Sequence, residues 1–369
     1  MICLKPSKKK IIQIIISEIF IITVPTPINA DNKPDISFVE SAFDKVFKQI
    51  TPKSGSILVL ESTVYPGVTR EVVSRFSTRE GLSYPEDFVF AYCPERIDPG
   101  VGNRPISSIH RVVGCDDSDT AQLLVSLYSQ ISAGADFVGP PEVAEAAKLI
   151  ENVQRDVDIA LTNELAIVLS NHGLDAEEVF SAASTKWNFH RHKPGIGVGG
   201  HCIAVDPYYY LNLFEGQDIL SESIVRVSRH TNNKMPQISK EQLVRDFSLS
   251  EEDKILVLGY SYKPNVGDPR NTPVKPLITA LSSLKIECEI FEPLFYQEST
   301  EAVWHTEERT LASDYSAIIV ATPHEIFDLT PNNLEQFCPR KRIFDGRRVL
   351  EKKTFIQQGW HFSAIGLEN

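Results

Sequence analysis

Residues 142–171 read EVAEAAKLIENVQRDVDIALTNELAIVLSN, a run without glycine or proline that decides how the chain is organised. Pro140 and Pro141 precede the run and His172-Gly173 follows it, as is typical where a helix begins and ends. Apolar residues recur every four positions and form a stripe that drifts slowly around the helix: Leu149, Val153, Val157, Leu161, Leu165 and Leu169. The run therefore predicts one long amphipathic helix in the middle of the chain.

The same helix carries a polar face. Lys148, Asn152 and Arg155 follow one another at spacings of four and three, which places them on one side of a helix. A solvated surface is the simplest explanation for a single lysine. Two basic residues beside an amide are also the groups that an anionic or oxyanion-forming ligand needs, and both interpretations stay open.

The segments on either side alternate strands with helices, which predicts two α/β domains with parallel sheets. Before the long helix we expect helices at 36–49, with Asp35 as N-cap, and 69–76, and strands at 19–24, 56–61, 88–92 and 111–114. After it we expect a helix at 222–233 and strands at 254–258, 286–291, 317–321 and 342–345. Three polar residues follow strands of the first domain, where parallel sheets bind ligands: Thr26, Thr63 and Glu95. The expected domains are residues 1–139, 140–235 and 236–369.

The composition excludes several classes of protein. Hydrophobic residues make up 42% and charged residues 23% of the chain, values typical of globular proteins. The formal net charge of -12 argues against nucleic acid as the main partner. No CxxC pair occurs among the scattered cysteines, which argues against a zinc site or a disulfide framework and favours a reducing cytoplasm: Cys3, Cys93, Cys115, Cys202, Cys288 and Cys338.

The N-terminal segment has a basic part at 5–10 and an apolar part at 11–24, as in a signal peptide or membrane anchor. The apolar run of about 14 residues is shorter than the roughly 20 that span a bilayer. Gln13, Ser17 and Glu18 interrupt it. We therefore favour a buried strand at 19–24 and expect no membrane partner.

Residues 195–207 read GIGVGGHCIAVDP and place Cys202 directly after a glycine-rich loop, with Asp206 four residues further on. Glycines allow a backbone to approach a ligand closely, so a cysteine at the end of such a loop is free to attack a bound substrate. A tight turn with a buried thiol is the alternative that the residues alone leave open.

Six motifs stand in order along the chain: VPTP (24–27), ESTVYPG (61–67), YCPER (92–96), AKLIEN (147–152), GGHCIAVDPYY (199–209) and YKPN (262–265), the last followed by Asp268 and Arg270. Together they resemble the UDP-glucose/GDP-mannose dehydrogenase family, and within it the members that oxidise UDP-N-acetylhexosamines. The resemblance implies two Rossmann-like domains joined by a long central helical region.

The resemblance also implies that the first domain is incomplete. The family opens with a strand, a Gly-x-Gly-x-x-Gly turn and a helix, which hold the pyrophosphate of NAD. Residues 1–17 contain no glycine. The chain is therefore similar to an N-terminally truncated member, with NAD as the cofactor and with Thr26 and Thr63 as its expected contacts.

The implied reaction oxidises the C6 alcohol of a UDP-N-acetylhexosamine to a carboxylate, with reduction of two NAD⁺, for surface polysaccharide synthesis. Cys202 would form a thiohemiacetal and then a thioester, with Lys148 as the positive neighbour of its thiolate. Lys148 and Asn152 would stabilise the oxyanion, and Asp206 would orient a water molecule or the lysine. Glu95 and Thr63 resemble the water-activating pair of the family. The residues alone also allow three structural roles: a turn cap for Asp206, an ion pair of Glu95 with Arg96, and a solvent-facing imidazole for His201.

The expected substrate contacts extend over all three regions: Arg96, Ile97, Arg155, Lys186, Gly199, Tyr262, Lys263 and Arg270. In the family the counterpart of Arg270 often reaches the neighbouring subunit, and Lys186 would meet the sugar in the same way, so a homodimer is expected. A surface position is the alternative for Lys186. No metal is expected. The alternative to an enzyme is a non-catalytic remnant that still binds UDP-sugar and dimerises.

Overall fold

The computed structural model describes residues 18–97, 105–213, 222–297 and 301–368. The chain forms two compact units. Unit 1 comprises residues 1–153 and 205–220, and unit 2 comprises residues 154–204 and 221–369. The predicted strand at 19–24 lies in unit 1 as a shorter strand, whereas the basic and apolar N-terminal segment up to residue 17 lies outside the described residues.

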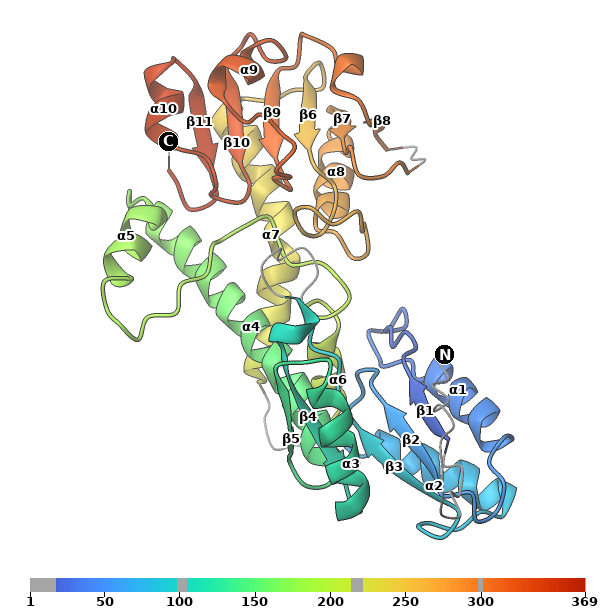
Figure 1. Ribbon diagram of the computed structural model, residues 1–369. Helices are drawn as coiled ribbons and strands as arrows, with labels where there is room; N and C mark the ends of the chain where they lie inside the picture. The colour runs from blue at the N-terminus through green and yellow to red at the C-terminus, as the bar shows by residue number, and fades with distance from the viewer. Residues whose placement is uncertain (1–17, 98–104, 214–221, 298–300, 369) are drawn as a thin grey trace. The chain divides into compact units, whose positions relative to one another are not determined.

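Unit 1 contains a five-stranded sheet with the order β1-β2-β3-β4-β5 (Figure 1). Its strands are β1 (Ile19–Ile22), β2 (Ser56–Leu60), β3 (Phe88–Tyr92), β4 (His110–Cys115) and β5 (Gly134–Phe137). The helices that belong to unit 1 alone are α1 (Ser37–Phe47), α2 (Val68–Glu80), α3 (Ser118–Ser129) and α6 (Asp206–Asn212).

Strand β2 shows why this sheet has two covered faces. All five of its residues are buried. Leu58 and Leu60 belong to the apolar cluster that includes the buried side of α1 and α2, whereas Val59 belongs to the cluster beneath α3. Side chains alternate along a strand, so a strand with apolar residues at every position is buried on both faces.

Two expectations for unit 1 were wrong. Strands β3 and β4 pair antiparallel, with Ala91 opposite Cys115, although a uniformly parallel sheet was predicted. A parallel pair needs a crossover, and the described part of this connection holds only the short helix η1 (Ile106–Ser108). The N-cap of α1 is Ile36, and the carboxylate of Asp35 instead accepts a hydrogen bond from the backbone N–H of Ser37 at 3.0 Å.

The long central helix is confirmed as α4 (Pro141–Ser170). Its apolar stripe differs in environment along its length. Leu149 and Val153 are buried, whereas Leu161 and Leu165 are 53% and 38% exposed. The N-terminal part of the stripe therefore belongs to the core of unit 1, Leu161 and Leu165 remain at the surface of the described chain, and Leu169 packs against the core of unit 2.

Unit 2 contains a six-stranded sheet with the order β11-β10-β9-β6-β7-β8, and every pair of neighbours in it is parallel. The strands are β6 (Lys254–Leu258), β7 (Glu287–Phe291), β8 (Val303–His305), β9 (Ala317–Val320), β10 (Arg342–Asp345) and β11 (His361–Ala364). Its other elements are α5 (Ala176–Ala183), α7 (Ile224–Phe247), α8 (Val274–Ser282), η2 (Glu308–Thr310), α9 (Pro331–Glu335) and α10 (Lys352–Gln357). The predicted parallel sheet is confirmed here.

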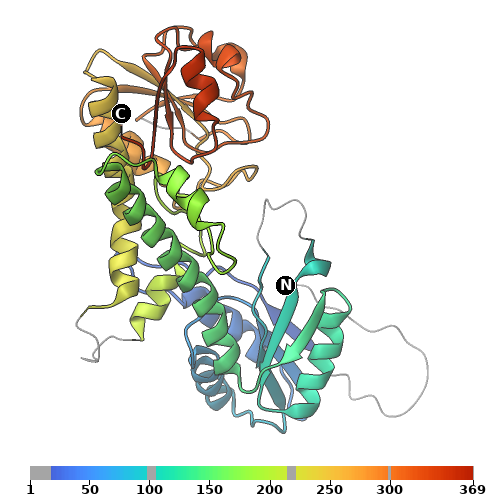
Figure 2. The same cartoon turned by 90° about the vertical axis from the view of Figure 1, so that its left-hand side faces the viewer.

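Helix α7 runs beside the C-terminal half of α4 in both views (Figures 1 and 2). A buried ion pair joins them, because Nη1 of Arg229 lies 2.6 Å from Oδ1 of Asp156. A helix was expected only over 222–233, but α7 continues through Pro236 to Phe247. Proline removes one helical hydrogen bond, and packing of α7 against α8 holds the helix together past that position.

Candidate active site

Cys202 differs from the other cysteines in its exposure. It is partly exposed, whereas Cys93, Cys115, Cys288 and Cys338 are buried. Burial raises the pKa of the Cys93 and Cys115 thiols to about 11 and that of Cys288 to about 12, so these thiols stay protonated and unreactive. Cys3 lies outside the described residues. Among the described cysteines, only Cys202 is placed to react with a ligand from solution.

The imidazole of His201 lies beside this thiol. Its Nδ1 is 3.1 Å from Sγ of Cys202, within hydrogen-bond distance for sulfur. The sequence also allowed an imidazole that faces only solvent. In the structure the imidazole instead contacts the sulfur of the neighbouring cysteine. A protonated imidazole at this distance stabilises the negative charge of a thiolate.

The loop of residues 195–202, here called the cysteine loop, lies against the loop of residues 259–271, here called the Tyr262 loop. A Cβ atom on Gly199 would lie 2.6 Å from the carbonyl oxygen of Asn271, and one on Gly200 would lie 2.8 Å from the ring of Tyr262. The N–H of Gly200 donates to the carbonyl of Arg270 at 3.1 Å. Only glycine allows this approach, and the predicted substrate contacts Gly199, Tyr262 and Arg270 are thereby brought together.

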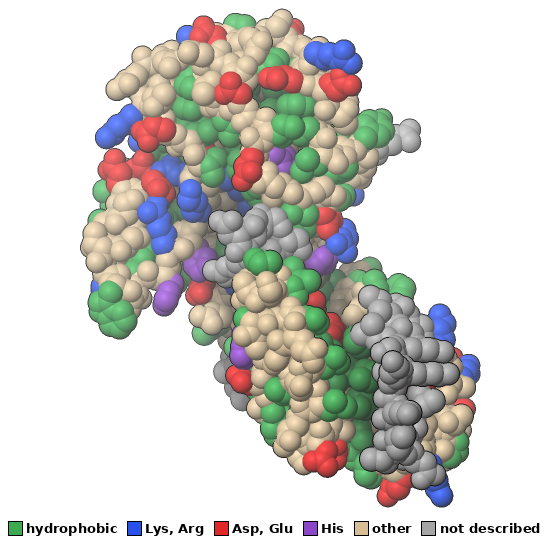
Figure 3. Space-filling model, in the orientation of Figure 1, with side chains coloured by type: hydrophobic (Ala, Val, Ile, Leu, Met, Phe, Trp, Pro, Cys, Tyr) green, Lys and Arg blue, Asp and Glu red, His purple; other side chains and the backbone are tan. Residues whose placement is uncertain are grey.

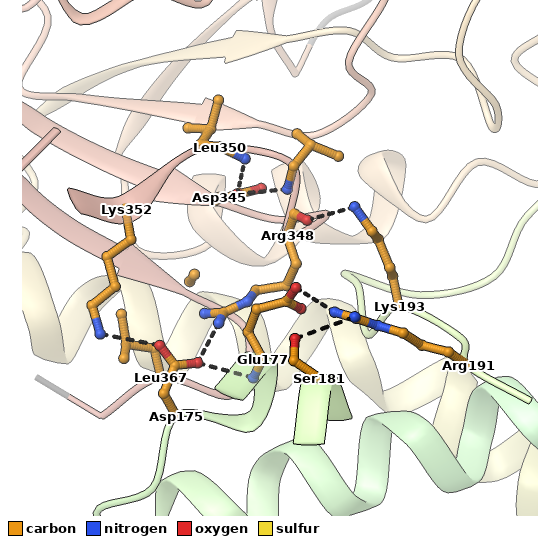
Figure 4. Close-up of polar contacts among 12 residues, drawn as sticks. Asp175, Glu177, Ser181, Arg191, Lys193, Asp345, Arg348, Leu350, Lys352 and Leu367 are labelled. Carbon is orange, nitrogen blue, oxygen red and sulfur yellow. Dashed lines mark hydrogen bonds and ion pairs between the residues drawn. The ribbon is translucent and has the colours of Figure 1, made fainter. Parts of the chain in front are cut away.

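The start of the cysteine loop is fixed by three anchors. The N–H of Gly195 donates to Oδ1 of Asn163 at 2.9 Å, and the N–H of Ile196 donates to the carbonyl of Gly346 at 3.1 Å. Nζ of Lys193 donates to the carbonyl of Arg348 at 3.0 Å (Figure 4). The loop is therefore held by the helix α4 and by the loop that follows strand β10.

Basic residues surround these anchors. Asp175 accepts hydrogen bonds from Arg348 and from Lys352, the latter at 3.1 Å (Figure 4). Arg191 pairs with Glu177 nearby on α5. Lys and Arg side chains, drawn in blue, gather beside α5 on the face seen in Figure 3. Within this group of described residues, cations outnumber carboxylates near the beginning of the cysteine loop.

Arg347 is a site residue that the sequence analysis missed. Its Nε donates to the carbonyl of Ala321 at 2.8 Å and its Nη1 donates to the carbonyl of Gly197 at 3.2 Å. None of the ion pairs between described residues includes it, and removal from water lowers its pKa to about 10. Its place directly after strand β10 of a parallel sheet is the signal that could have identified it.

A second polar group lies in unit 1 around the N-terminal half of α4. Nδ2 of Asn152 donates to Oδ2 of Asp206 at 2.6 Å, and both residues are buried. Nζ of Lys148 donates to the carbonyl of Glu95 at 2.6 Å. Burial raises the pKa of the Asp206 carboxyl to about 7, although the hydrogen bond from Asn152 and the charge of Lys148 oppose that rise.

This geometry speaks against the turn cap considered for Asp206. The residue stands in the first turn of α6, whose N-cap is Val205 without a side-chain hydrogen bond. The carboxylate contacts Asn152 rather than capping the turn, so the structural role considered for it is wrong. Lys148, Asn152, Asp206 and the backbone of Glu95 are brought together as polar groups in an otherwise apolar part of unit 1, next to the cluster of Leu149, Val205 and Tyr209.

Glu95 and Arg96 do not pair with each other. The carboxylate of Glu95 accepts a hydrogen bond from the N–H of Ile97. Arg96 pairs with Glu151 instead and donates to the carbonyl of His110 at 3.0 Å. The ion pair considered for Glu95 and Arg96 is therefore wrong, and Arg96 is tied to the helix α4.

The remaining predicted site residues differ in exposure. Arg155 and Lys186 are exposed, so Arg155 is less enclosed than Lys148 and Asn152 on the same helix. Tyr262 and Lys263 are partly buried. Arg270 is exposed and holds Asp268 through Nη2 at 2.6 Å. Among the described residues, no group of three or more His, Cys, Asp and Glu could hold a metal ion.

The strand ends of unit 1 supply part of what a dinucleotide needs. Thr26 and Thr63 are partly buried polar residues that follow β1 and β2, at the edge where parallel sheets bind cofactors. A pyrophosphate is bound by backbone N–H groups at a glycine turn and a helix N-terminus. The first glycine of the sequence is Gly55. The described residues thus fit the strand-edge part of an NAD site and not its pyrophosphate turn.

Three family models match consecutive parts of the chain. The UDP-glucose/GDP-mannose dehydrogenase family is matched by its NAD binding domain over residues 5–132, its central domain over 142–234 and its UDP binding domain over 256–352. Together with the two α/β sheets, these matches define an NAD-dependent dehydrogenase. The chain belongs to the UDP-glucose/GDP-mannose dehydrogenase family, and NAD is the cofactor of its NAD-binding domain.

Two relatives and one solved structure illustrate the similarity. The UDP-N-acetyl-D-glucosamine 6-dehydrogenase of Pseudomonas aeruginosa is 39% identical over 324 residues, which cover 84% of this chain and 74% of the relative. The UDP-N-acetyl-D-mannosamine dehydrogenase of Pyrococcus horikoshii is 31% identical over 95% of this chain and 81% of the relative. The structure of the UDP-D-ManNAc dehydrogenase from Pyrococcus horikoshii matches with a TM-score of 0.82 and 29% identity, over 94% of this chain and 81% of that chain.

Within the described residues, no helix has the length and apolar character that crossing a bilayer requires.

Replacing Asp206 by asparagine should change how stability depends on pH. The folded protein keeps the Asp206 proton up to about pH 7, whereas the unfolded chain releases it near the ordinary value of 3.8. Rising pH between these values therefore favours the unfolded chain. We expect wild type to lose stability relative to Asp206→Asn from pH 4 to 8, as measured by urea unfolding.

The matched control is Asp44→Asn. A hydrogen bond from Lys48 lowers the pKa of Asp44, so its proton is almost completely released in both states above about pH 5. This variant should follow the pH dependence of wild type over the same range. Equal slopes for wild type and Asp206→Asn would show that the Asp206 carboxyl does not hold its proton to higher pH.

Proposed function

We propose that the protein oxidises the C6 alcohol of a UDP-N-acetylhexosamine, UDP-ManNAc or UDP-GlcNAc, to the uronic acid, through a covalent intermediate on Cys202. The observation that carries the proposal is the partly exposed thiol of Cys202 at the end of a glycine loop, with the imidazole of His201 3.1 Å from its sulfur. One relative is a UDP-N-acetyl-D-glucosamine 6-dehydrogenase and another is a UDP-N-acetyl-D-mannosamine dehydrogenase. They support a UDP-N-acetylhexosamine as the substrate class, and each of the two epimers has one relative in its favour.

The reaction is a four-electron oxidation in two steps. When bound, NAD supplies the acceptor for the hydride that leaves C6 in each step. The alcohol loses one hydride and one proton to give an aldehyde. The sulfur of Cys202 adds to the aldehyde carbon, whose oxygen takes up a proton. Loss of a second hydride from this thiohemiacetal, together with the proton of its hydroxyl, leaves a thioester. Water cleaves the thioester to release the carboxylate and the free thiol. Cys202 thus keeps the reactive carbon bound between the two oxidations.

The polar group of unit 1 supplies the remaining roles. The ammonium of Lys148 and the amide of Asn152 stabilise negative charge on the C6 oxygen, and one such donor is typically worth about 3 kcal/mol. Asp206 holds the Asn152 amide at 2.6 Å and so fixes its direction. Glu95 and Thr63 activate the water that cleaves the thioester.

The UDP part of the substrate is assigned to charged and polar residues of both units. Phosphate favours Arg and Lys, and Arg347 adds a cation that donates to the backbone carbonyls of Ala321 and Gly197 near the cysteine loop. The match of the UDP binding domain over residues 256–352 supports this assignment. The proposed contacts are Arg96, Ile97, Arg155, Lys186, Gly199, Tyr262, Lys263, Arg270 and Arg347.

A homodimer through α4 and α7 is part of the proposal. A groove of about 360 Å³ lies between these helices, lined by Val157, Leu161 and Val227 among others. Leu161, Ile224 and Val227 are 53%, 72% and 52% exposed, and a second copy of the chain would bury them. Closed two-fold pairing is the commonest way to cover such a stripe. We also place the reaction in the cytoplasm, because the described cysteines are all free thiols.

The alternative is a chain that binds UDP-sugar and dimerises without turnover. It is favoured by the absence of a glycine turn from the described residues between β1 and α1, since such a turn normally binds the pyrophosphate of NAD. Both possibilities share the same UDP contacts, so binding of the two ligands distinguishes them.

Changing Cys202 to alanine should abolish formation of the uronic acid. Loss of a covalent nucleophile typically lowers the rate by about a thousandfold or more. The measurement is the formation of NADH, two per sugar in wild type, with UDP-GlcNAc and UDP-ManNAc as substrates. Cys115→Ala is the control and should keep the wild-type rate, because Cys115 is buried at the end of strand β4. Normal turnover by Cys202→Ala would overturn the assignment.

A titration calorimeter should detect tighter binding of UDP-N-acetylhexosamine than of NAD. The contacts for the UDP-sugar are spread over the described residues of both units, whereas the NAD pyrophosphate depends on a glycine turn that the described residues lack. Binding of UDP-sugar alone would favour the non-catalytic alternative. Micromolar binding of NAD, with hydride transfer at a normal rate, would contradict this order of affinities and support the enzyme.

Sedimentation should show a dimer at micromolar concentration for wild type and a monomer for Leu161→Glu. The substitution places a carboxylate in the apolar groove, where pairing of two chains would bury it without a partner. Leu284→Glu, at a residue that is 41% exposed beyond α8, is the control and should remain a dimer. Monomeric wild type would disprove the proposed interface.

A further inference from the structure

Two buried titratable side chains stand where the strands of unit 2 end, and the mechanism above does not use them. Glu292 follows strand β7 and is 0% exposed, and His324 follows strand β9 and is 2% exposed. Their side chains are joined, with His324 Nε2 3.0 Å from Glu292 Oε2. Burying a carboxylate is costly unless hydrogen bonds or charges compensate, so the partners of Glu292 indicate what it does there.

The partners of Glu292 are loop groups. Its Oε2 accepts hydrogen bonds from the backbone N–H of Tyr260 at 2.9 Å, and from the N–H and the hydroxyl of Ser261, each at 3.1 Å. Its Oε1 accepts from the N–H of Leu294 at 3.1 Å. Among the ion pairs of the described residues, Glu292 pairs with no lysine or arginine. The carboxylate therefore holds the first residues of the Tyr262 loop rather than a cation.

His324 holds the same loop at its other side. The backbone N–H of Asn265 can only donate, and it lies 2.9 Å from Nδ1 of His324, so Nδ1 is the acceptor. The ring hydrogen is then on Nε2 and points to Glu292. This assignment gives a neutral imidazole that links Asn265 to the buried carboxylate.

Three further contacts fix the segment between these two points. The hydroxyl of Thr322 donates to the carbonyl of Ser261 at 2.6 Å. The side chain of Asn265, whose φ is 61°, accepts from the N–H of Glu325 at 2.9 Å. A Cβ atom on Gly259 would lie 2.1 Å from the carbonyl oxygen of Thr322, so the loop begins in close contact with the backbone that follows strand β9. Residues 259–265 are thus held at both ends against the sheet.

Tyr262 and Lys263 stand in the middle of this held segment. The ring of Tyr262 is the group that leaves no room for a side chain on Gly200, two residues before Cys202. The conformation of the Tyr262 loop therefore bears on a proposed UDP contact and on the cysteine loop together. A displacement of the loop would alter both.

We propose that Glu292 and His324 are positioning residues that preorganise the Tyr262 loop for the UDP part of the substrate. The inference rests on the proposed function of that loop. It assigns to neither residue any contact with the substrate. Preorganisation increases affinity because the ordering of the loop takes place on folding and not on binding.

The test compares Glu292→Gln with a matched control in the strand that directly precedes Glu292. Glu289 is also a buried glutamate of β7, and it is also hydrogen-bonded to a histidine, with His305 Nε2 at 2.8 Å. Its other partners are Lys254 and Tyr315, which lie outside the Tyr262 loop. Both amide variants should lower the thermal midpoint of unfolding, because both disturb a buried hydrogen-bonded carboxylate.

The decisive measurement is the dissociation constant of UDP by calorimetry. We expect Glu292→Gln to weaken UDP binding on the order of tenfold, and Glu289→Gln to leave it unchanged. Hydrogen exchange of the amides of residues 260–265 should become faster in Glu292→Gln only. Equal UDP affinity for wild type and Glu292→Gln would overturn the positioning role, while the proposed function would stand. Failure of wild type to bind UDP would overturn the proposed function and this role with it.

A milder variant covers the case in which Glu292→Gln does not fold. Ser261→Ala removes one of the hydrogen bonds to Glu292 and leaves the carboxylate and the imidazole in place. It should weaken UDP binding about two- to threefold, which corresponds to the loss of one modest hydrogen bond. A folded Ser261→Ala with wild-type affinity and wild-type exchange of residues 260–265 would also overturn the proposal.

Discussion

The absence of side chains at positions 199 and 200 is the constraint on which the geometry around Cys202 depends. A Cβ at either position would lie within 2.9 Å of Asn271 or Tyr262, closer than real atoms approach. The cysteine loop can lie against the Tyr262 loop only because the backbone of Gly199 faces the Asn271 carbonyl and the backbone of Gly200 faces the Tyr262 ring. In this arrangement the N–H of Gly200 donates to the carbonyl of Arg270, which restricts the path of the residues that follow. The position of the thiol is thus a consequence of packing within unit 2.

Three buried carboxylates that hold backbone N–H groups provide the second common element. Glu145 accepts hydrogen bonds from the N–H groups of Gly67 and Thr69, at 2.7 and 3.0 Å, at the start of α2. Asp345 accepts from the N–H groups of Val349 and Leu350 after β10, both at 2.7 Å. Glu292 does the same for the Tyr262 loop. A carboxylate that receives several N–H groups fixes a loop more narrowly than apolar packing does, because each hydrogen bond requires a direction as well as a distance.

The sequence predicted the strands that hold an unbroken run of four apolar residues. Strands β2, β6 and β9 each contain such a run, so their bounds were predicted almost to the residue. Strands β8 and β11 were missed because they are short and contain Trp304, His305 and Ser363 among their few residues. The antiparallel direction of β4 could not be predicted either, since strand direction depends on the connection and not on the composition of the strand. Arg347, Glu292 and His324 were missed for a related reason, because each acquires its role from partners distant in the sequence.

The neighbour of the Cys202 thiol in the structure differs from the one expected from the sequence. From the sequence, Lys148 was the expected positive neighbour, and a contact between adjacent residues in a loop was judged no more probable than a solvent-facing imidazole. In the structure Nζ of Lys148 donates to the carbonyl of Glu95, while Nδ1 of His201 lies 3.1 Å from the sulfur. A lysine whose ammonium donates to a carbonyl in unit 1 has part of its hydrogen-bonding capacity already used there. The imidazole nitrogen lies at hydrogen-bond distance from the sulfur, because the two side chains follow each other in a loop whose path is fixed by the contacts of Gly199 and Gly200.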